Sequence, residues 1–478
     1  MSKFILSEEL DRSKVFIVKH SNLEKRLDPF YYIPKISELE EKVQEHNPKP
    51  LRDYVQSVSS GATPKTTESE KYYSTKENGI PFLRVQNLSP TGQLHLDDCK
   101  YINKATHESH LKRSQVSEGD LLVKITGVGR MAVASVAPEG FIGNTNQHMV
   151  VIKTGNIEIS KVLAAFLNSD IGEKLASRRA TGGTRPALDY SALMSIPIIY
   201  DEKILEITKK AVKQKGEKEQ QAQSLLGSIN DYLLRELGIT LPEKDNSLQN
   251  RIFTTTLSKV SGGRFDPIFF SKQINFLFQS KFDYRKIKDL AHSFRSGFGM
   301  GKNDQNLDKK GVVQVRPTNM MSHGVLSFHR NIYAPATFLD QYPTLKKGDI
   351  LFNNTNSQAL VGKTAMWENN LDQAFYSNHI TVIKVKNELV DPGYLKCVLN
   401  LYQSHRYFYS ICTNWNNQSG VGIEQLKTIK IPLPDLSIQK IISKRINQLY
   451  KESSILKKNG AEEMAKAQKE IESIIING

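Results

Sequence analysis

Three short stretches place reactive side chains near the spacing that an enzyme would need. Asp28-Pro-Phe-Tyr lacks the second proline of the Asp/Asn-Pro-Pro-aromatic motif of amino-group methyltransferases, and no glycine-rich cofactor loop follows a strand. His107-Glu-Ser-His110 is one residue shorter than the HExxH zinc motif, so its histidines would not share a helix face. Gly362-Lys-Thr ends like a phosphate-binding loop, but Ser357 stands where that loop needs glycine. The sequence therefore predicts a chain that is not itself an enzyme and has no metal, cofactor or ATP site.

Loops rich in amide, hydroxyl and basic side chains are the other chemical feature. Arg, Lys, Asn and Gln can pair with base edges, while Ser, Thr and Gly let the backbone approach phosphate. Taken singly, each loop also fits an ordinary solvated turn. The candidate DNA-binding residues are Thr63, Lys65, Lys124, Arg130, Asn144, Asn146, Arg178, Arg179, Arg185, Lys302, Asn353, Asn354, Asn356, Asn378, Asn414, Asn416 and Gln418.

A duplicated pattern gives these loops a common position. Arg26-Leu-Asp-Pro-Phe-Tyr-Tyr returns 238 residues later as Arg264-Phe-Asp-Pro-Ile-Phe-Phe, and the pair Arg84 and Asn87 returns 232 residues later as Arg316 and Asn319. Gly-Asp turns and a histidine before an apolar run also recur in the same order. Offsets that drift so little indicate duplication of one unit, a domain followed by a helix. The paired loops differ in side chains, as expected if each copy reads a different sequence.

Two long helices are expected to follow the two copies. Asp201 can cap the first, which runs to Leu237, and Gly238 suits the left-handed residue beyond its end. The second, over 437–478, repeats apolar residues at steps of four and three, as in a coiled coil. Two ordinary amphipathic helices on a globular core are the alternative. The candidate seam and docking residues are Ile204, Ile207, Leu226, Ile229, Leu233, Ile442, Ile446, Leu449 and Leu456.

Each copy is predicted to mix strands and helices. Leu121–Ile125 and Val150–Ile152 are β-rich, and one helix is expected in each copy, at Ser160–Ala176 and Pro392–Tyr409. The expected segments are a domain over 1–200, a helix over 201–237, a linker (238–262) and second domain over 238–436, and a helix over 437–478.

Composition limits the class of partner and the compartment. The 478 residues carry a formal charge of +15, and residues 238–436 contain 24 Lys and Arg against 15 Asp and Glu, which favours a polyanion such as DNA. The three cysteines form no CxxC pair, so we expect a reducing compartment. We find no signal peptide or apolar run long enough to cross a membrane, and we expect a cytoplasmic protein.

The whole pattern resembles the specificity subunit of a type I DNA restriction–modification enzyme. The local signs are Ile80-Pro-Phe-Leu-Arg-Val-Gln-Asn87, the Gly-Asp turns at 119 and 348, and Ile431-Pro-Leu-Pro-Asp-Leu-Ser-Ile-Gln-Lys. The resemblance implies an α+β fold with two duplicated α/β target-recognition domains separated by two long antiparallel helices, related by a pseudo-twofold. Each domain would read half of a bipartite site in double-stranded DNA.

The resemblance also implies the partners. Two adenine methyltransferase subunits would dock on the helices, restriction and translocase subunits would join them, and S-adenosylmethionine, ATP and Mg would bind to those subunits. Gly216 and the polar middle of the first helix depart from a typical member. A two-headed adaptor between proteins is the alternative function. Salt-dependent retention on heparin or duplex DNA would separate the two, because counterion release is a property of DNA binding.

Overall fold

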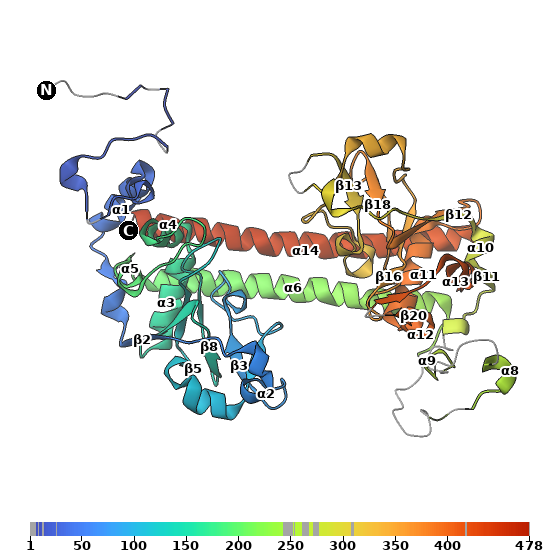
Figure 1. Cartoon of the computed structure of the whole chain (residues 1–478), viewed down its shortest axis with the longest axis horizontal. Helices are drawn as coiled ribbons and strands as arrows, with labels where there is room; N and C mark the ends of the chain where they lie inside the picture. The colour runs from blue at the N-terminus through green and yellow to red at the C-terminus, as the bar shows by residue number, and fades with distance from the viewer. Residues whose placement is uncertain are drawn as a thin grey trace. The chain divides into compact units, whose positions relative to one another are not determined.

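The computed structural model describes residues 6–477 except 8, 12–13, 25, 242–251, 253, 261–266, 271–276, 307–309 and 416–417. Its contacts divide the chain into two compact units. Unit 1 comprises residues 1–220 and 456–478, and unit 2 comprises residues 221–455. Two long helices, α6 (Glu202–Leu237) and α14 (Leu436–Asn477), each contribute residues to both units (Figure 1).

Unit 1 is built on two small sheets. The first has the strand order β2-β9-β6-β7 and is antiparallel, and the second has the order β4-β3-β8-β5, in which β3 and β8 run parallel. The strands are β1 (Lys49–Pro50), β2 (Ser57–Ser60), β3 (Ile80–Leu83), β4 (Lys100–Ile102), β5 (Gln115–Ser117), β6 (Leu121–Lys124), β7 (Ala134–Val136), β8 (Ile142–Thr145), β9 (Met149–Lys153) and β10 (Pro197–Ile198). The helices are α1 (Pro34–Glu45), α2 (Ser69–Tyr72), α3 (Ile157–Asn168), α4 (Asp170–Arg179) and α5 (Tyr190–Met194).

The first three residues of β6, 121–123, are all apolar because both faces of this strand are covered. Leu121 and Val123 of β6 pack with α3 in one core cluster. Leu122, between them, packs with Leu83 of β3 in another cluster. Side chains alternate across a strand, so each neighbouring pair of residues serves two cores. This explains why Leu121–Ile125 shows no polar alternation in sequence.

Unit 2 repeats this architecture. Two of its sheets correspond to those of unit 1 and have the orders β12-β19-β15-β17 and β14-β13-β18, again with one parallel pair, β13 and β18. In addition β11 pairs with β22, and β16, β21 and β20 form a three-stranded sheet. The strands are β11 (Tyr284–Lys286), β12 (Ala291–Ser296), β13 (Val312–Val315), β14 (Tyr333–Ala334), β15 (Ile350–Asn353), β16 (Thr355–Asn356), β17 (Thr364–Met366), β18 (Ala374–Tyr376), β19 (Ile380–Val385), β20 (Thr413–Trp415), β21 (Gln418–Gly420) and β22 (Lys430–Pro432). The helices are α8 (Leu257–Val260), α9 (Pro267–Phe270), α10 (Ile287–Leu290), α11 (Pro392–Ser404), α12 (Tyr407–Ile411) and α13 (Ile423–Thr428).

The framework contacts confirm the internal duplication. The Arg84 backbone N–H donates to Asn87 Oδ1 at 2.8 Å, and Asn87 Nδ2 donates to the carbonyl of His95. In unit 2 the Arg316 N–H donates to Asn319 Oδ1 at 2.9 Å, and Asn319 Nδ2 donates to the carbonyl of Ser327. The repeated Arg and Asn thus make the same short turn in both units.

The helix expected late in each copy is broken into two. At Ser169 the backbone becomes extended, and the Ser169 hydroxyl caps α4 by accepting from the N–H of Gly172. In unit 2 the break falls at Arg406, whose φ of 62° is left-handed. The two predicted single helices, Ser160–Ala176 and Pro392–Tyr409, were therefore wrong in extent. Apolar periodicity continues across both breaks, so sequence pattern alone did not reveal them.

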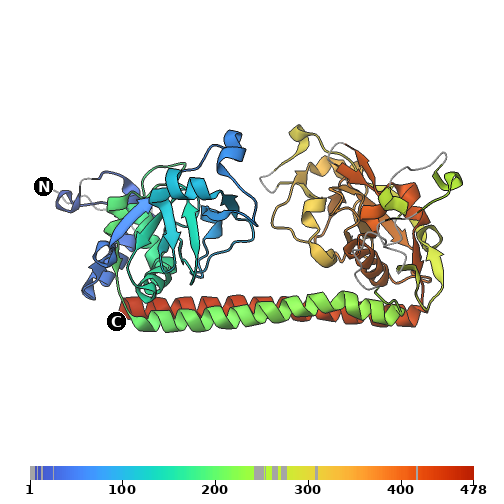
Figure 2. The same cartoon turned by 90° about the horizontal axis from the view of Figure 1, so that it is seen from below.

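A length of α6 lies antiparallel to a length of α14 in each unit (Figure 2). In unit 1, Lys218 Nζ pairs with Glu463 Oε1 at 3.1 Å, and Ile204 shares a core cluster with Ile471. In unit 2, Ser453 Oγ donates to the carbonyl of Ala222 at 3.2 Å. Residue numbers rise along one helix as they fall along the other, which confirms the antiparallel pairing.

The ends of α6 and the first Arg-x-Asp-Pro motif have the structures expected. Asp201 accepts from the N–H of Lys203 at 2.8 Å, and Gly238 has a φ of +67°. Arg26 bonds Asp28 at 2.8 Å and also donates to the carbonyls of residues 179 and 180, so the motif fixes a turn against the end of α4. Arg264 and Asp266, in the second copy, and most of the expected linker (238–262) lie outside the described residues. No helix in the described ranges is long and apolar enough to span a bilayer.

Candidate nucleic-acid interface

Four loops of unit 1 meet beside the end of β6. Thr126 bridges to Ala187, and the N–H of Ile125 donates to the carbonyl of His148 at 3.0 Å. Thr63 Oγ1 donates to Gln147 Oε1 at 2.7 Å. These contacts bring together the loops 61–65, 125–130, 145–148 and 181–187, three of which come from separate strands of the two sheets.

The same four loops meet in unit 2. The N–H of Asn354 donates to the carbonyl of His379 at 3.0 Å, and the N–H of Val421 donates to the carbonyl of Asn354 at 2.9 Å. Strand β16 pairs with β21, at the place where unit 1 has the single bridge from Thr126 to Ala187. The loops of this group are 297–302, 354–362, 376–379 and 413–420.

A glycine in each unit permits the close approach of two of these loops. A Cβ at Gly61 would stand 1.6 Å from the carbonyl oxygen of Thr145, and a Cβ at Gly297 would stand 2.0 Å from that of Tyr376. Both distances are far below van der Waals contact, so any side chain at either position would push a strand aside. These glycines hold the first loop of each group against the end of β8 or β18.

Several sequence-predicted residues are exposed on these loops. They are Thr63, Lys65, Arg185, Lys302, Asn378, Asn414 and Gln418, together with the half-buried Asn356. Arg185 Nη2 lies 3.4 Å from His148 Nε2, and Asn414 Oδ1 accepts from Ser419 Oγ at 2.6 Å. Burial and, after it, the Arg185 charge lower the pKa of His148. The role of these residues in contacting DNA stays a prediction, and Asn416 lies outside the described residues.

Arg178 and Arg179 do not have the exposure that DNA contact requires. Their exposed fractions are 9% and 8%, and both guanidinium groups pair with the carboxylate of Glu40. Arg178 also donates to the carbonyl of Tyr31 and lies over its ring, 4.3 Å from the centroid. The prediction of DNA contacts for these two arginines is therefore corrected: they hold α4 to α1 inside unit 1.

Lys124 and Arg130 brace a loop rather than project from it. Lys124 is buried, and its Nζ donates to the carbonyls of Val128 and Arg130 at 2.8 and 2.9 Å. Arg130 pairs with Asp170 at 2.8 Å and donates to carbonyls at the junction of α3 and α4. Burial lowers the pKa of Lys124. Both residues keep the 125–130 loop in one conformation.

Four predicted asparagines also serve the framework. Asn144 is fully buried and bonds His107 and the carbonyl of Leu111. Asn146 accepts from the N–H of His148, and Asn354 donates to Ser296, Thr381 and the carbonyl of Asn378. Asn353 is fully buried and donates weakly to the carbonyl of Leu360, at 3.3 Å. Buried amides that are bonded within the fold cannot read a base edge, so the predictions for Asn144, Asn353 and Asn354 are corrected as well. The DNA contact of Asn146 stays a prediction.

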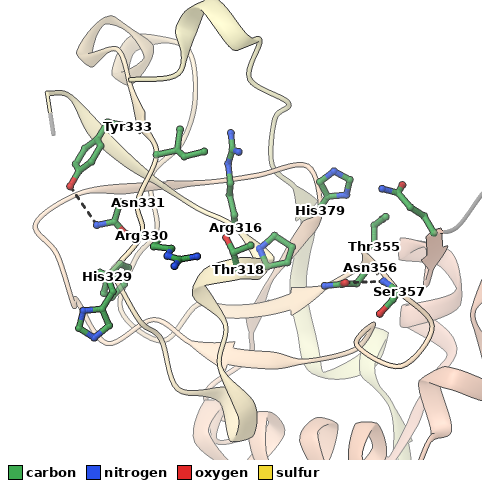
Figure 3. A pocket seen from close by; sticks show the side chains of 14 residues that line it. Arg316, Thr318, His329, Arg330, Asn331, Tyr333, Thr355, Asn356, Ser357 and His379 are labelled. Carbon is green, nitrogen blue, oxygen red and sulfur yellow. Dashed lines mark hydrogen bonds between the residues drawn. The ribbon is translucent and has the colours of Figure 1, made fainter. Parts of the chain in front are cut away.

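A concavity beside the loops of unit 2 has a volume of about 1090 Å³. Figure 3 shows Arg316 and His379 projecting into it, with Thr355, Asn356 and Ser357 on one side and Asn331 and Tyr333 on the other. Arg330 and Gln418 also line it. The site therefore joins predicted loop residues to two arginines, Arg316 and Arg330, that sequence reasoning did not propose as DNA-binding residues. The signal was the repeat itself, which pairs Arg316 with Arg84.

The apolar residues predicted to dock other subunits are mostly internal. Ile204 and Ile207 pack into the core of unit 1. Leu226, Ile229, Leu233, Ile442, Ile446 and Leu449 pack into the core of unit 2, and Leu456 is half-buried. They join the helices to each other and to the unit cores. On α14 the large apolar side chains that face outward are Ile441 and Ile455, with exposed fractions of 63% and 56%.

Comparison with known proteins identifies the class of domain. Residues 279–464 match the family model of the type I restriction modification DNA specificity domain. A putative type I restriction enzyme MjaX specificity subunit of Methanocaldococcus jannaschii is 28% identical over 164 residues, which are 34% of this chain. The match spans 38% of that relative's length.

Two solved structures align along most of this chain at low sequence identity. The type I restriction–modification S subunit of M. genitalium aligns over 88% of this chain and 94% of its own, at 12% identity and a TM-score of 0.39. The HsdS subunit of Thermoanaerobacter tengcongensis aligns over 89% and 94%, at 14% identity and a TM-score of 0.31.

The chain contains a type I restriction modification DNA specificity domain, and the resemblance noted in its sequence is confirmed. The stretch 1–220, which the family model does not cover, repeats the strand orders of unit 2, with β5 added at one edge, and its turn contacts. It is therefore a second copy of the same architecture. Within the described ranges no three His, Cys, Asp or Glu side chains gather as a metal ion would require.

Proposed function

We propose that this chain is the DNA-reading specificity subunit of a type I restriction–modification complex. Each unit reads one half of a bipartite site in double-stranded DNA through its group of four loops. The observation that carries the proposal is that the two units repeat one framework but differ in their loop side chains. Arg185 lies on the fourth loop of unit 1, whereas the fourth loop of unit 2 is the β20–β21 hairpin with an exposed Trp415.

The chemistry of the complex belongs to other subunits in this proposal. This chain binds no cofactor, and S-adenosylmethionine, ATP and Mg are used by two adenine methyltransferase subunits and by restriction and translocase subunits. The outward flank of α14, which includes Ile441 and Ile455, is a better docking surface for a methyltransferase subunit than the buried seam.

The test is the pattern of methylated adenines in cells that carry the system with and without this chain. The expected result is a two-part motif that appears only with the chain. Replacing loops 181–187 should change one half of that motif and leave the other half unaltered. A motif that does not depend on the chain would refute the proposal. Binding without a steep salt dependence to heparin and duplex DNA would instead support the protein adaptor.

A further inference from the structure

Arg84 and Arg316 occupy equivalent positions but have opposite electrostatic surroundings. Both precede the same short turn, and each backbone N–H is bonded by the asparagine three residues later. The alignment holds through the next strands, since β3 pairs Pro81 with Tyr101 and β13 pairs Val313 with Tyr333. The constant offset of 232 residues makes Asp98 the counterpart of Arg330.

In unit 1 the guanidinium of Arg84 is held by the segment around Asp98. Its Nη2 donates to the main-chain carbonyl of Asp98 at 2.9 Å and lies 3.6 Å from the Asp98 carboxylate. Gln86 Nε2 donates to the same carboxylate at 3.1 Å. A carboxylate beside a guanidinium competes for its donors and repels electronegative atoms of DNA.

In unit 2 the guanidinium of Arg316 has no such partner. Its Nε donates to Gln314 Oε1 at 3.1 Å, and none of the described residues that line the concavity around Arg316 and Arg330 is acidic. The two remaining nitrogens face the concavity that also holds His379, Asn356 and Gln418 (Figure 3). Burial lowers the pKa of Arg316, so its charge is poorly solvated and gains from an acceptor.

Building on the function proposed above, we infer that Arg316 reads a guanine in the half-site of unit 2, and that the residue at position 330 decides its availability. The free end of a guanidinium matches the O6 and N7 acceptors of guanine, which is the commonest specific contact in the major groove. Gln314 fixes the orientation by engaging Nε. Arg84 does not read a base, because the Asp98 segment engages its end.

The experiment measures the dissociation constant of the full chain, with its methyltransferase subunits, for a duplex that carries the mapped motif. Arg316→Ala should weaken binding by about 5- to 150-fold and remove the preference for one G·C pair in one half-site. Replacing that guanine by 7-deazaguanine, which lacks the N7 acceptor, should weaken binding by the wild-type chain and not by Arg316→Ala. The wild-type measurement with 7-deazaguanine uses no protein variant, so its result does not depend on whether a variant folds.

Position 330 supplies the second variant. Arg330→Asp recreates the charge of Asp98 and should reproduce the loss seen with Arg316→Ala, with little further loss in the double variant. Arg330→Ala, which removes the cation without adding a carboxylate, should keep the G·C preference. Arg84→Ala is the matched control in the other unit and should change affinity by less than about threefold.

Each other outcome overturns the inference. An equal loss on all sequences, with a salt slope lower by about one, would make Arg316 a phosphate contact. Equal effects of Arg330→Asp and Arg330→Ala on the G·C preference would show that the charge at position 330 does not decide whether Arg316 is available. If the wild-type complex fails to distinguish its motif from a scrambled duplex, the proposed function falls and this inference with it. If the wild-type complex prefers its motif and the Arg316→Ala complex keeps the same preference, only the inference about Arg316 falls.

Discussion

The burial of the Arg178 and Arg179 guanidinium groups in unit 1 can be tested most directly at their shared partner, Glu40. Its side chain is 13% exposed, and those of Arg178 and Arg179 are 11% and 9% exposed. Arg178 Nη1 donates to Glu40 Oε2 at 2.6 Å, and Arg179 Nη1 donates to the same oxygen at 3.1 Å. Glu40→Gln removes the negative charge and leaves two positive charges with little solvent around them.

The expected loss follows from the cost of an uncompensated buried charge, about 3–5 kcal/mol. Amide exchange in α1 and α4, where it proceeds by unfolding, should then accelerate by roughly 10²- to 4 × 10³-fold, since 1.4 kcal/mol is about a factor of ten. Hydrogen exchange with mass spectrometry measures this separately for each helix. Glu108→Gln is the control, because its pair with Lys104 is exposed and contributes at most about 0.5 kcal/mol.

The outcome also decides what the two arginines do. Arg178→Ala and Arg179→Ala should likewise loosen α1 and α4 and leave the methylated motif unchanged wherever unit 1 stays folded. If exchange in α1 and α4 is the same in Glu40→Gln as in the wild type, the burial argument is refuted. If Arg178→Ala alters one half of the motif while protection is retained, that arginine contacts a base after all.

Three further predictions concern the framework. Gly297→Ala should destabilise unit 2 by about 1–3 kcal/mol, because the new Cβ would clash with Tyr376. Gly183→Ala is the control and should not destabilise unit 1, because nothing lies within 4 Å of its new Cβ. Equal losses of stability in chemical denaturation would contradict the loop contact. Gly216→Ala in α6 should stabilise the chain by about 1 kcal/mol, because the site is exposed and open; a lower melting temperature would count against this. Burial raises the pKa of Tyr407 to about 12, so the folded chain keeps this proton where the unfolded chain loses it. The stability that Tyr407 contributes is complete below about pH 10 and is lost between pH 10 and about 12. Denaturation followed by the fluorescence of the buried Trp367 should show that Tyr407→Phe loses less stability over this pH range than the wild type. An equal loss of stability in the two proteins would show that Tyr407 is not its source.

Patterns that repeat along the chain gave the architecture without a structure. The apolar stripes predicted α6 and α14, and the recurrence of Arg84 and Asn87 as Arg316 and Asn319 predicted two copies of one fold. Such features depend on backbone geometry and on local hydrogen bonds, which a short stretch of sequence specifies. The caps Asp201 and Gly238 were predictable for the same reason.

Partners distant in sequence were decided only by the tertiary structure. Arg178 and Arg185 belong to one basic stretch, yet the first is buried against Glu40, 138 residues away, and the second is exposed beside His148. The prediction that apolar residues of the two long helices dock other subunits failed for a similar reason. The residues with the strongest helical periodicity are mostly buried in the cores of the two units. Apolar periodicity predicts that one face of a helix is buried, but it does not tell whether the chain's own core or another subunit covers that face.

The sequence by itself therefore determined the two long helices and the duplication of one unit. Only the tertiary structure decided which charged side chains remain available, because availability depends on the exposure and ion pairing of each side chain in the folded chain. Arg84 and Arg316 are equal in sequence context, and the difference between them appears only when Asp98 and Arg330 are placed beside them. Electrostatic free energy depends on the distance between charges and on the solvent around them, and both are set by the folded arrangement of residues that the chain keeps apart.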